Sequence, residues 1–123
     1  MNKNIETGKI GEEKACEYLM KKGYQIINRN YWKKFGEIDI VARAKDKTLV
    51  FIEVKTLLMK SSNGFMPEDN FTTQKYRIVK RTCSYFAANH PELIDDDLGW
   101  RMDLIAIEIL PDGKFSIRHY ENV

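Results

Sequence analysis

The sequence has 123 residues, of which 43% are hydrophobic and 31% are charged, and its net charge at pH 7 is +2. This length and composition predict one soluble globular domain over residues 1–123, with enough apolar residues for a core. The small net charge excludes a strongly basic chain, so any surface that binds nucleic acid must be local.

The apolar segments are short. None approaches the ~20 residues that cross a bilayer, and the first residues lack the apolar stretch of a signal peptide. We therefore expect no membrane partner and a cytoplasmic location. Cys16 and Cys83 are far apart, and each lies in a helical pattern, so we expect two buried thiols in a reducing compartment rather than a disulfide.

Hydrophobic periodicity predicts a first helix over residues 7–22. Ala15, Cys16 and Leu19 recur at helical spacing, and Gly23 provides a stop. Three strands are expected next, with a connection at 31–35 between the first two; the strands cover residues 24–30, 36–43 and 48–56.

The second half of the chain begins with a long polar loop over residues 57–71, a kind of loop that is often functional. Thr72 or Thr73 can cap a second helix that extends to about Asn89. Two further strands are expected over 100–110 and 114–120. The order α-β-β-β-α-β-β predicts an α/β fold in which helices flank a mixed sheet.

Charged residues interrupt the two central strands. Asp39 lies in the first, and Glu53 and Lys55 lie in the second, among Val, Ile and Phe. A carboxylate taken out of water costs several kcal/mol unless something pairs with it. Because successive side chains of a strand point to opposite faces, Ile38 and Ile40 should share an apolar face that packs on a helix. The acidic side chains should share the other face, which would line a cleft or hold an ion.

The loop length sets how the two strands pair. A three-residue loop at 45–47 pairs Ala44 with Thr48 and places Asp39 opposite Glu53, with their Cβ atoms ~5 Å apart. A five-residue loop gives the same register, whereas a two-residue loop would separate the two faces. Because two opposed carboxylates repel each other, a divalent cation would relieve the conflict, and Mg²⁺ suits such a donor set.

Two more residues extend this predicted site. Lys55 lies on the same face as Glu53, ~6.6 Å along the strand, where it could reach a phosphate oxygen. Glu12 shares the apolar face of the first helix, where it could complete the metal shell. The alternative for Glu12 is a favourable interaction with the positive helix N-terminus.

The predicted site resembles the core of the PD-(D/E)xK nucleases, which have the restriction-endonuclease-like fold. The resemblance lies in a hairpin that carries Asp39 and then Glu53-Val54-Lys55, and in the glutamate of the helix that precedes it. The chain is more closely similar to the bacterial YraN-like family of candidate endonucleases, which is related to archaeal Holliday-junction resolvases. The shared segments are spread over nearly the whole chain: GKIGE at 8–12, GEID at 36–39, VFIEVKT at 50–56, QK at 74–75 and RMDLIA at 101–106.

The resemblance implies metal-dependent cleavage of DNA, including branched DNA, with Mg²⁺ or Mn²⁺ as cofactor. It assigns Glu12, Asp39 and Glu53 to the metal and Asp39, Glu53 and Lys55 to catalysis. The chain departs from the family pattern at Leu57, where an arginine is frequent, and at Met102, where a phenylalanine is frequent. A homodimer would suit cleavage of two strands, on fold analogy alone.

Several basic residues are candidates for phosphate binding. Lys75 at the start of the second helix is the strongest, followed by Arg77, Lys33 and Lys34, although a solvated surface explains most of them equally well. Trp32 could stack on bases or serve as a core or interface residue. Glu37 either supports the metal ligands or is solvated, and we expect His90 and His119 at the surface.

Two other interpretations remain open. Asp39, Glu53 and Lys55 could form a structural ion-pair cluster, although buried ion pairs seldom add net stability. The chain could also be a nucleic-acid-binding module without turnover, within a repair or recombination assembly. A weaker alternative is a protein-interaction domain.

Overall fold

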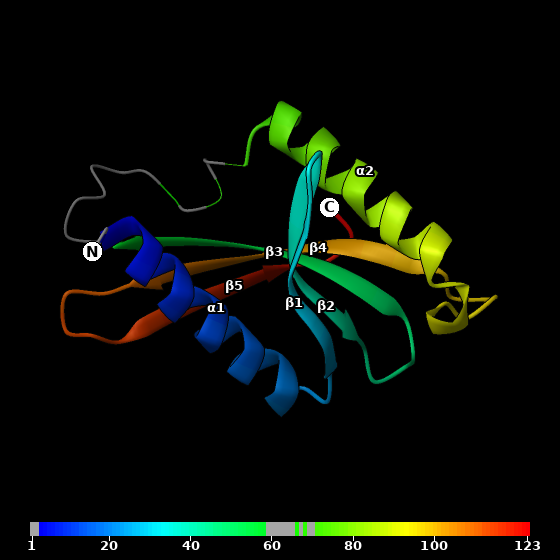
Figure 1. Ribbon diagram of the computed structural model, residues 1–123. Coiled ribbons are helices and arrows are strands. Elements are labelled where there is room, and N and C mark those ends of the chain that lie inside the picture. Colours follow the sequence, from blue (N-terminus) through cyan, green and yellow to red (C-terminus); the bar gives the residue numbers. More distant parts are fainter. Residues whose placement is uncertain (1–2, 59–65, 67, 69–70) are drawn as a thin grey trace.

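The structure, a computed structural model, describes residues 3–58, 66, 68 and 71–123 (Figure 1). Its elements follow the predicted order α-β-β-β-α-β-β, with one added 3-10 turn, η3 (Pro91–Leu93). The two helices are α1 (Lys3–Lys21) and α2 (Thr73–Asn89). The strands are β1 (Gln25–Lys33), β2 (Gly36–Arg43), β3 (Leu49–Leu58), β4 (Trp100–Ile109) and β5 (Phe115–Tyr120). The predicted α/β fold class is confirmed.

The five strands form one mixed sheet in the order β1-β2-β3-β4-β5. Only β3 and β4 are parallel, and the other neighbours are antiparallel. A parallel pair needs a long crossover, and α2 lies in the connection between β3 and β4. None of the described helices is long and apolar enough to span a bilayer.

The helices pack on different sets of strand residues and so produce two cores. Beneath α1, Ala15, Cys16 and Leu19 contact a cluster that includes Ile52 and Ile105. Beneath α2, a second cluster joins Val79, Cys83, Phe86 and Ala87 to Leu49, Phe51 and Met102. Burying each large apolar side chain contributes about 1.5–3 kcal/mol. Cys16 and Cys83 are free, buried thiols, as predicted.

The hairpin of β1 and β2 is longer than predicted. The expected connection at 31–35 is mostly strand, because Tyr31 pairs with Ile38, Trp32 with Glu37, and Lys33 with Gly36. Aromatic residues favour strands, and Tyr31 adds an edge-to-face contact with Phe86 of α2, with ring centroids 5.0 Å apart. We call residues 31–38, which form the end of this hairpin, the hairpin arm.

The hairpin arm diverges from the rest of the sheet and is not paired with β3. The β2–β3 ladder runs from Arg43↔Leu49 to Ile40↔Ile52, and the preceding part of β2 follows β1 toward α2 (cyan in Figure 1). Ile38 therefore packs with the cluster beneath α2, whereas Ile40 packs beneath α1. The prediction that these two isoleucines share a face is wrong, because the turn of the strand breaks simple alternation. A fork between β2 and β3 opens at Asp39.

Other boundaries differ by a few residues. Helix α1 begins at Lys3 rather than residue 7, and β3 continues to Leu58, so Leu57 is a strand residue. Most of the predicted loop, residues 59–65, 67 and 69–70, lies outside the described residues. Thr72 caps α2 as predicted, accepting a hydrogen bond from the Lys75 N–H at 3.3 Å.

Two glycines allow close approach of helices and strands around the fork. A Cβ atom at Gly11 would overlap the Thr56 side chain, so the α1 backbone lies directly against β3. A Cβ atom at Gly36 would overlap the Thr82 hydroxyl and press on Ile78, so the arm lies directly against α2. Both contacts need a residue without a side chain.

Candidate active site

Asp39 and Glu53 lie at the fork, in the register that the loop length predicted. The Ala44 N–H donates to the Thr48 carbonyl at 2.9 Å, which leaves a three-residue loop, and Asp39 and Glu53 are the next residues after the last ladder pair. Both residues are more than nine-tenths buried. The Val54 N–H donates to Asp39 Oδ2 at 2.8 Å, and this bond fixes the Asp39 carboxyl against β3.

This pair holds two carboxyl groups where water is largely excluded. Burial, followed by the negative charge of Glu53, raises the pKa of Asp39 to about 8. Glu53 Oε1 lies 3.2 Å from Lys55 Nζ. Glu53 Oε2 is buried and has no hydrogen-bond donor among the described residues. One proton can be held between the two carboxyls, and a divalent cation could take the place of that proton.

A pocket of about 330 Å³ opens beside this pair. It lies between the start of β2, β3 and the first turns of α2, and its lining residues are Gly36, Glu37, Glu53, Lys55, Lys75, Ile78 and Val79. Two cations therefore face the same space as the buried Glu53. Glu37, for which the sequence allowed either a supporting role or a solvated position, is exposed and lines the pocket.

Glu12 of α1 approaches the fork from the other helix. It is half-buried, and burial, followed by the charge of Asp39, raises its pKa. With its amide nitrogen turned toward α1, Asn30 donates to both Glu12 oxygens at 3.2 Å. Within the described part of the chain, however, the oxygens of Glu12, Asp39 and Glu53 do not gather within 4.8 Å of one another. The structure thus brings Asp39 and Glu53 together and leaves Glu12 just outside.

The predicted phosphate-binding residues divide into two groups. Lys75 lines the pocket, whereas Lys34 and Arg77 are exposed and do not. Lys33 Nζ lies 5.6 Å from the centre of the Tyr31 ring and 5.7 Å from that of Tyr85, so it helps to hold the arm on α2. Trp32 is 64% exposed, which excludes a core position for it.

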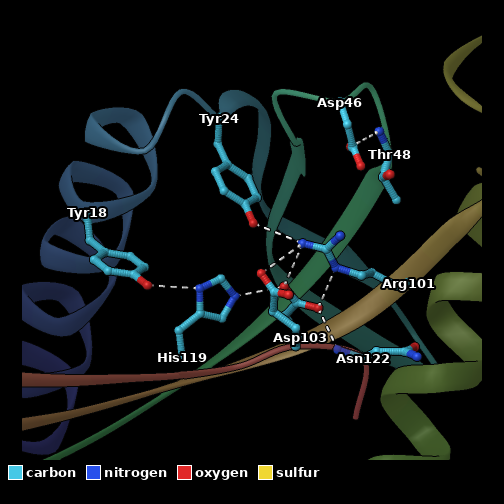
Figure 2. A network of polar contacts seen from close by, with 9 residues as sticks. Tyr18, Tyr24, Asp46, Thr48, Arg101, Asp103, His119 and Asn122 are labelled. Carbon is cyan, nitrogen blue, oxygen red and sulfur yellow. Dashed lines mark hydrogen bonds and ion pairs between the residues drawn. The ribbon is translucent and has the colours of Figure 1, made fainter.

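A second buried acidic group was not predicted (Figure 2). His119, expected at the surface, has a side chain only 6% exposed, and its Nε2 lies 2.7 Å from Asp103 Oδ2. Its Nδ1 lies 3.0 Å from the Tyr18 hydroxyl. Since an ionised carboxylate only accepts, Nε2–H donates to Asp103, and Nδ1 of the neutral imidazole accepts from Tyr18. The sequence contained one signal for the burial of His119. On a strand, His119 shares a face with Phe115 and Ile117, and both of these pack beneath α1.

Arg101 completes this group. Its Nε lies 3.0 Å from Asp103 Oδ1, and its Nη2 donates to the Tyr24 hydroxyl at 2.9 Å (Figure 2). The Asn122 N–H also donates to Asp103 Oδ1 at 2.9 Å. Burial alone would raise the pKa of Asp103, but the hydrogen bonds from His119, Asn122 and Arg101 outweigh it and lower that pKa. We call Tyr18, Tyr24, Arg101, Asp103, His119 and Asn122 the Asp103 network.

Two members of the Asp103 network and the neighbouring Glu121 have the composition and spacing of a metal site. Asp103, His119 and Glu121 place ligand atoms within 4.8 Å of one another. The Arg101 guanidinium already supplies the positive charge, since it contacts Asp103 and lies 3.5 Å from Glu121. Both Asp103 oxygens are hydrogen-bonded, so this group ties β4, β5 and α1 together as a structural element.

Comparison with known proteins identifies relatives over most of the chain. The model of an uncharacterised protein family, UPF0102, matches residues 11–107. A UPF0102 protein of Alkaliphilus oremlandii is 38% identical over 123 residues, which cover 99% of this chain and 98% of that protein. A relative from Campylobacter concisus is 39% identical and covers 82% of both chains. A third, from Caldicellulosiruptor saccharolyticus, is 46% identical and covers 70% of both. The chain therefore belongs to the uncharacterised protein family UPF0102.

Proposed function

We propose that this protein is a metal-dependent endonuclease that hydrolyses phosphodiester bonds in DNA. The observation that carries the proposal is the buried Glu53 oxygen without a donor among the described residues, next to Asp39, in a pocket that also presents Lys55 and Lys75. A structural ion-pair cluster would satisfy its buried oxygens within the protein. Here one oxygen has been left for something that the described part of the chain does not provide.

The donor set fits a hard divalent cation. Asp39 and Glu53 would hold Mg²⁺ or Mn²⁺ through carboxylate oxygens, and Glu12, whose pKa responds to the charge of Asp39, would act through an intervening water. When bound, such a cation supplies charge stabilisation at a phosphoryl oxygen and makes water more acidic. Among the described residues, no cysteine or histidine lines this pocket, which disfavours a soft-metal site.

The protein's own groups position the substrate. Lys55 and Lys75 lie on two walls of the pocket, from β3 and α2, and together they can bind a phosphate and stabilise the charge that develops on it. The Val54 N–H holds Asp39 in place, so the carboxyl does not need to reorganise when a ligand enters. The ion pair with Glu53 places the Lys55 ammonium 3.2 Å from the metal-binding carboxylate.

The choice of DNA as substrate rests on phosphate chemistry and on the resemblance to PD-(D/E)xK nucleases. Lysines bind phosphates without reading sequence. We therefore expect selection by DNA structure, with branched DNA among the substrates, rather than by base sequence.

The test is a cleavage panel of single-stranded, duplex, flap and four-way-junction DNA, with Mg²⁺ and with Mn²⁺, beside Asp39→Ala, Glu53→Ala and Lys55→Ala. We expect metal-dependent cleavage by the wild type and none by the three variants. Equal cleavage by all four proteins would refute the assignment of the site. Salt-sensitive binding that needs no metal and survives Asp39→Ala, without any cleavage, would instead identify a non-catalytic binding module.

A further inference from the structure

Trp32 is a large apolar side chain that is exposed to water on strand β1. It is 64% exposed, although it lies within β1 and pairs with Glu37 across the hairpin. Within the described ranges, the Trp32 side chain has no aromatic, cationic or hydrogen-bonding partner. An exposed tryptophan that the fold itself does not use is a candidate contact for a partner.

The position of Trp32 relates it to the fork. On the arm, Tyr31 and Ile38 pack beneath α2, so Trp32 and its opposite neighbour Glu37 lie on the other face. Asp39 follows two residues after Glu37, about 6.6 Å along the strand. Glu37 also lines the pocket together with Glu53 and Lys55, which places this face of the arm toward that pocket. Trp32 therefore stands on the pocket side of the arm, beside the proposed metal site.

The arm that carries Trp32 is fixed to α2. The Phe35 and Tyr85 rings meet edge-to-face, with centroids 5.2 Å apart, and the Arg81 guanidinium lies 5.3 Å from the Phe35 centroid. Gly36 is in contact with Thr82. Trp32 is thus presented at a set distance from Asp39, as a stacking platform must be.

The charges around Trp32 select the part of a nucleotide that can lie there. The lysines that attract phosphate, Lys55 and Lys75, line the pocket, whereas Glu37, the residue opposite Trp32, would repel a phosphate placed beside the indole. A base is uncharged and has an aromatic face that can stack on an indole. With the backbone in the pocket, the base falls on the Trp32 side.

We propose that Trp32 stacks on an unpaired base next to the phosphate held at Asp39 and Glu53, so that the substrates are nucleic acids with unpaired nucleotides at the cleavage position. This inference rests on the proposed function. A base within an intact duplex is stacked on its neighbours and must leave them to reach Trp32. Single strands, flaps, gaps and branch points offer such a base directly.

The first experiment measures binding in EDTA, so that it does not depend on cleavage. The probes are a single strand of about 20 nucleotides, longer than the ~4–16 nucleotides that such grooves contact, and the corresponding duplex. Trp32→Ala should weaken single-strand binding about 5- to 150-fold, which corresponds to ~1–3 kcal/mol for one stacked base, and should remove most of the preference over duplex. Trp32→Phe should keep part of that preference.

A spectroscopic readout separates stacking from a change in fold. In a Trp100→Phe background, Trp32 is the remaining tryptophan, and single-stranded DNA should quench its fluorescence more than duplex does. Met20→Ala is the matched control, because Met20 is also an exposed apolar residue, at 55%, but lies near the end of α1. This variant should bind as the wild type does.

The outcomes distinguish this inference from the proposed function. Cleavage by the wild type with unchanged strand preference in Trp32→Ala would overturn the role of Trp32 and leave the nuclease intact. Single-strand binding that needs Trp32, without cleavage under any metal, would support the stacking role and overturn the nuclease. Binding of neither probe in EDTA, together with no cleavage under either metal, would overturn both. A dimer that Trp32→Ala dissociates, with DNA binding unaffected, would show that a second copy covers Trp32 and would overturn the inference.

Discussion

Two buried acidic groups lie on the same sheet, and they are built in opposite ways. In the Asp103 network each oxygen of Asp103 has a donor, and Arg101 balances the charge. At the fork, Asp39 and Glu53 oppose each other, and Glu53 Oε2 has no donor among the described residues. The pKa of Asp103 is lowered and that of Asp39 is raised. A buried carboxylate that the fold satisfies contributes structure, whereas one that it leaves in conflict can hold a ligand.

The largest expected difference between the two groups is in catalysis. Asp39→Asn and Glu53→Gln should each reduce metal-dependent cleavage at least ~1,000-fold, because a bound metal contributes several kcal/mol to such reactions. The same variants should unfold at an unchanged or higher temperature, since each removes one of two buried carboxyl groups that compete for a single proton, and the amide oxygen introduced by Asp39→Asn would still accept from the Val54 N–H. Single-turnover cleavage and thermal unfolding measure the two effects. A clear loss of stability in both variants would indicate a structural ion-pair cluster instead.

The corresponding change in the Asp103 network should act on stability. Asp103→Ala leaves Arg101 and His119 without their shared partner and should cost about 3–5 kcal/mol of unfolding free energy in urea denaturation. Asp96→Ala, at an exposed aspartate, is the control and should change stability by less than ~0.5 kcal/mol. A loss for Asp103→Ala as small as that of the control would remove the contrast between the two groups.

Cations should also separate the two groups. Mg²⁺ or Mn²⁺ at about 100 times its dissociation constant should stabilise the wild type by ~2.7 kcal/mol, and Glu53→Gln should lose this response. Asp103→Asn should retain it, because Arg101 already occupies that position. Thermal shift with Mg²⁺ and Mn²⁺ titrations checks this prediction. A response lost in Asp103→Asn but kept in Glu53→Gln would move the metal site to the other group.

The pH dependence of stability should have opposite signs. The folded chain holds a proton on Asp39 up to about pH 8, whereas the unfolded chain releases it near 3.8, so this stabilisation is complete below pH 3.8 and is lost as the pH rises to about 8. The slope is at most ~1.4 kcal/mol per pH unit. Asp103 has a folded pKa below 3.8, so its stabilisation is present above that pH and is lost on further acidification. Metal-free urea denaturation of wild type, Asp39→Asn and Asp103→Asn across this range measures both. Identical pH profiles for wild type and Asp39→Asn would contradict the first.

The smallest expected effect lies at the pocket wall. Lys75 and Arg77 are exposed cations two residues apart on α2, but only Lys75 lines the pocket. Lys75→Ala should weaken DNA binding severalfold and reduce the slope of log affinity against log salt by ~1, whereas Arg77→Ala should change both less. Equal effects of the two substitutions would indicate a diffuse basic surface.

Local rules predicted that Asp39 lies beside Glu53, and long-range contacts determined the fork and the rest of the site. The three-residue loop after Ala44 was enough to bring Asp39 next to Glu53, because register follows from loop length. Helix boundaries near Thr72 and Asn89 followed from capping and proline rules. His119 could not be placed in this way, since its partners Asp103 and Tyr18 are 16 and 101 residues away. The hairpin arm was also missed, because its path depends on contacts of Tyr31 and Phe35 with α2.

The contact between Gly11 and Thr56 bears on how this sequence tolerates change. Gly11 has no side chain that could take part in catalysis, yet any side chain at this position would push α1 away from β3. Glu12 follows Gly11 on α1 and Lys55 precedes Thr56 on β3, so this movement would shift Glu12 relative to Lys55. In a saturation library scored for activity, position 11 should therefore be nearly as intolerant as the acidic positions. Shortening residue 56 to glycine in the same molecule should restore part of the freedom at position 11, so that the two positions would vary together in such a library.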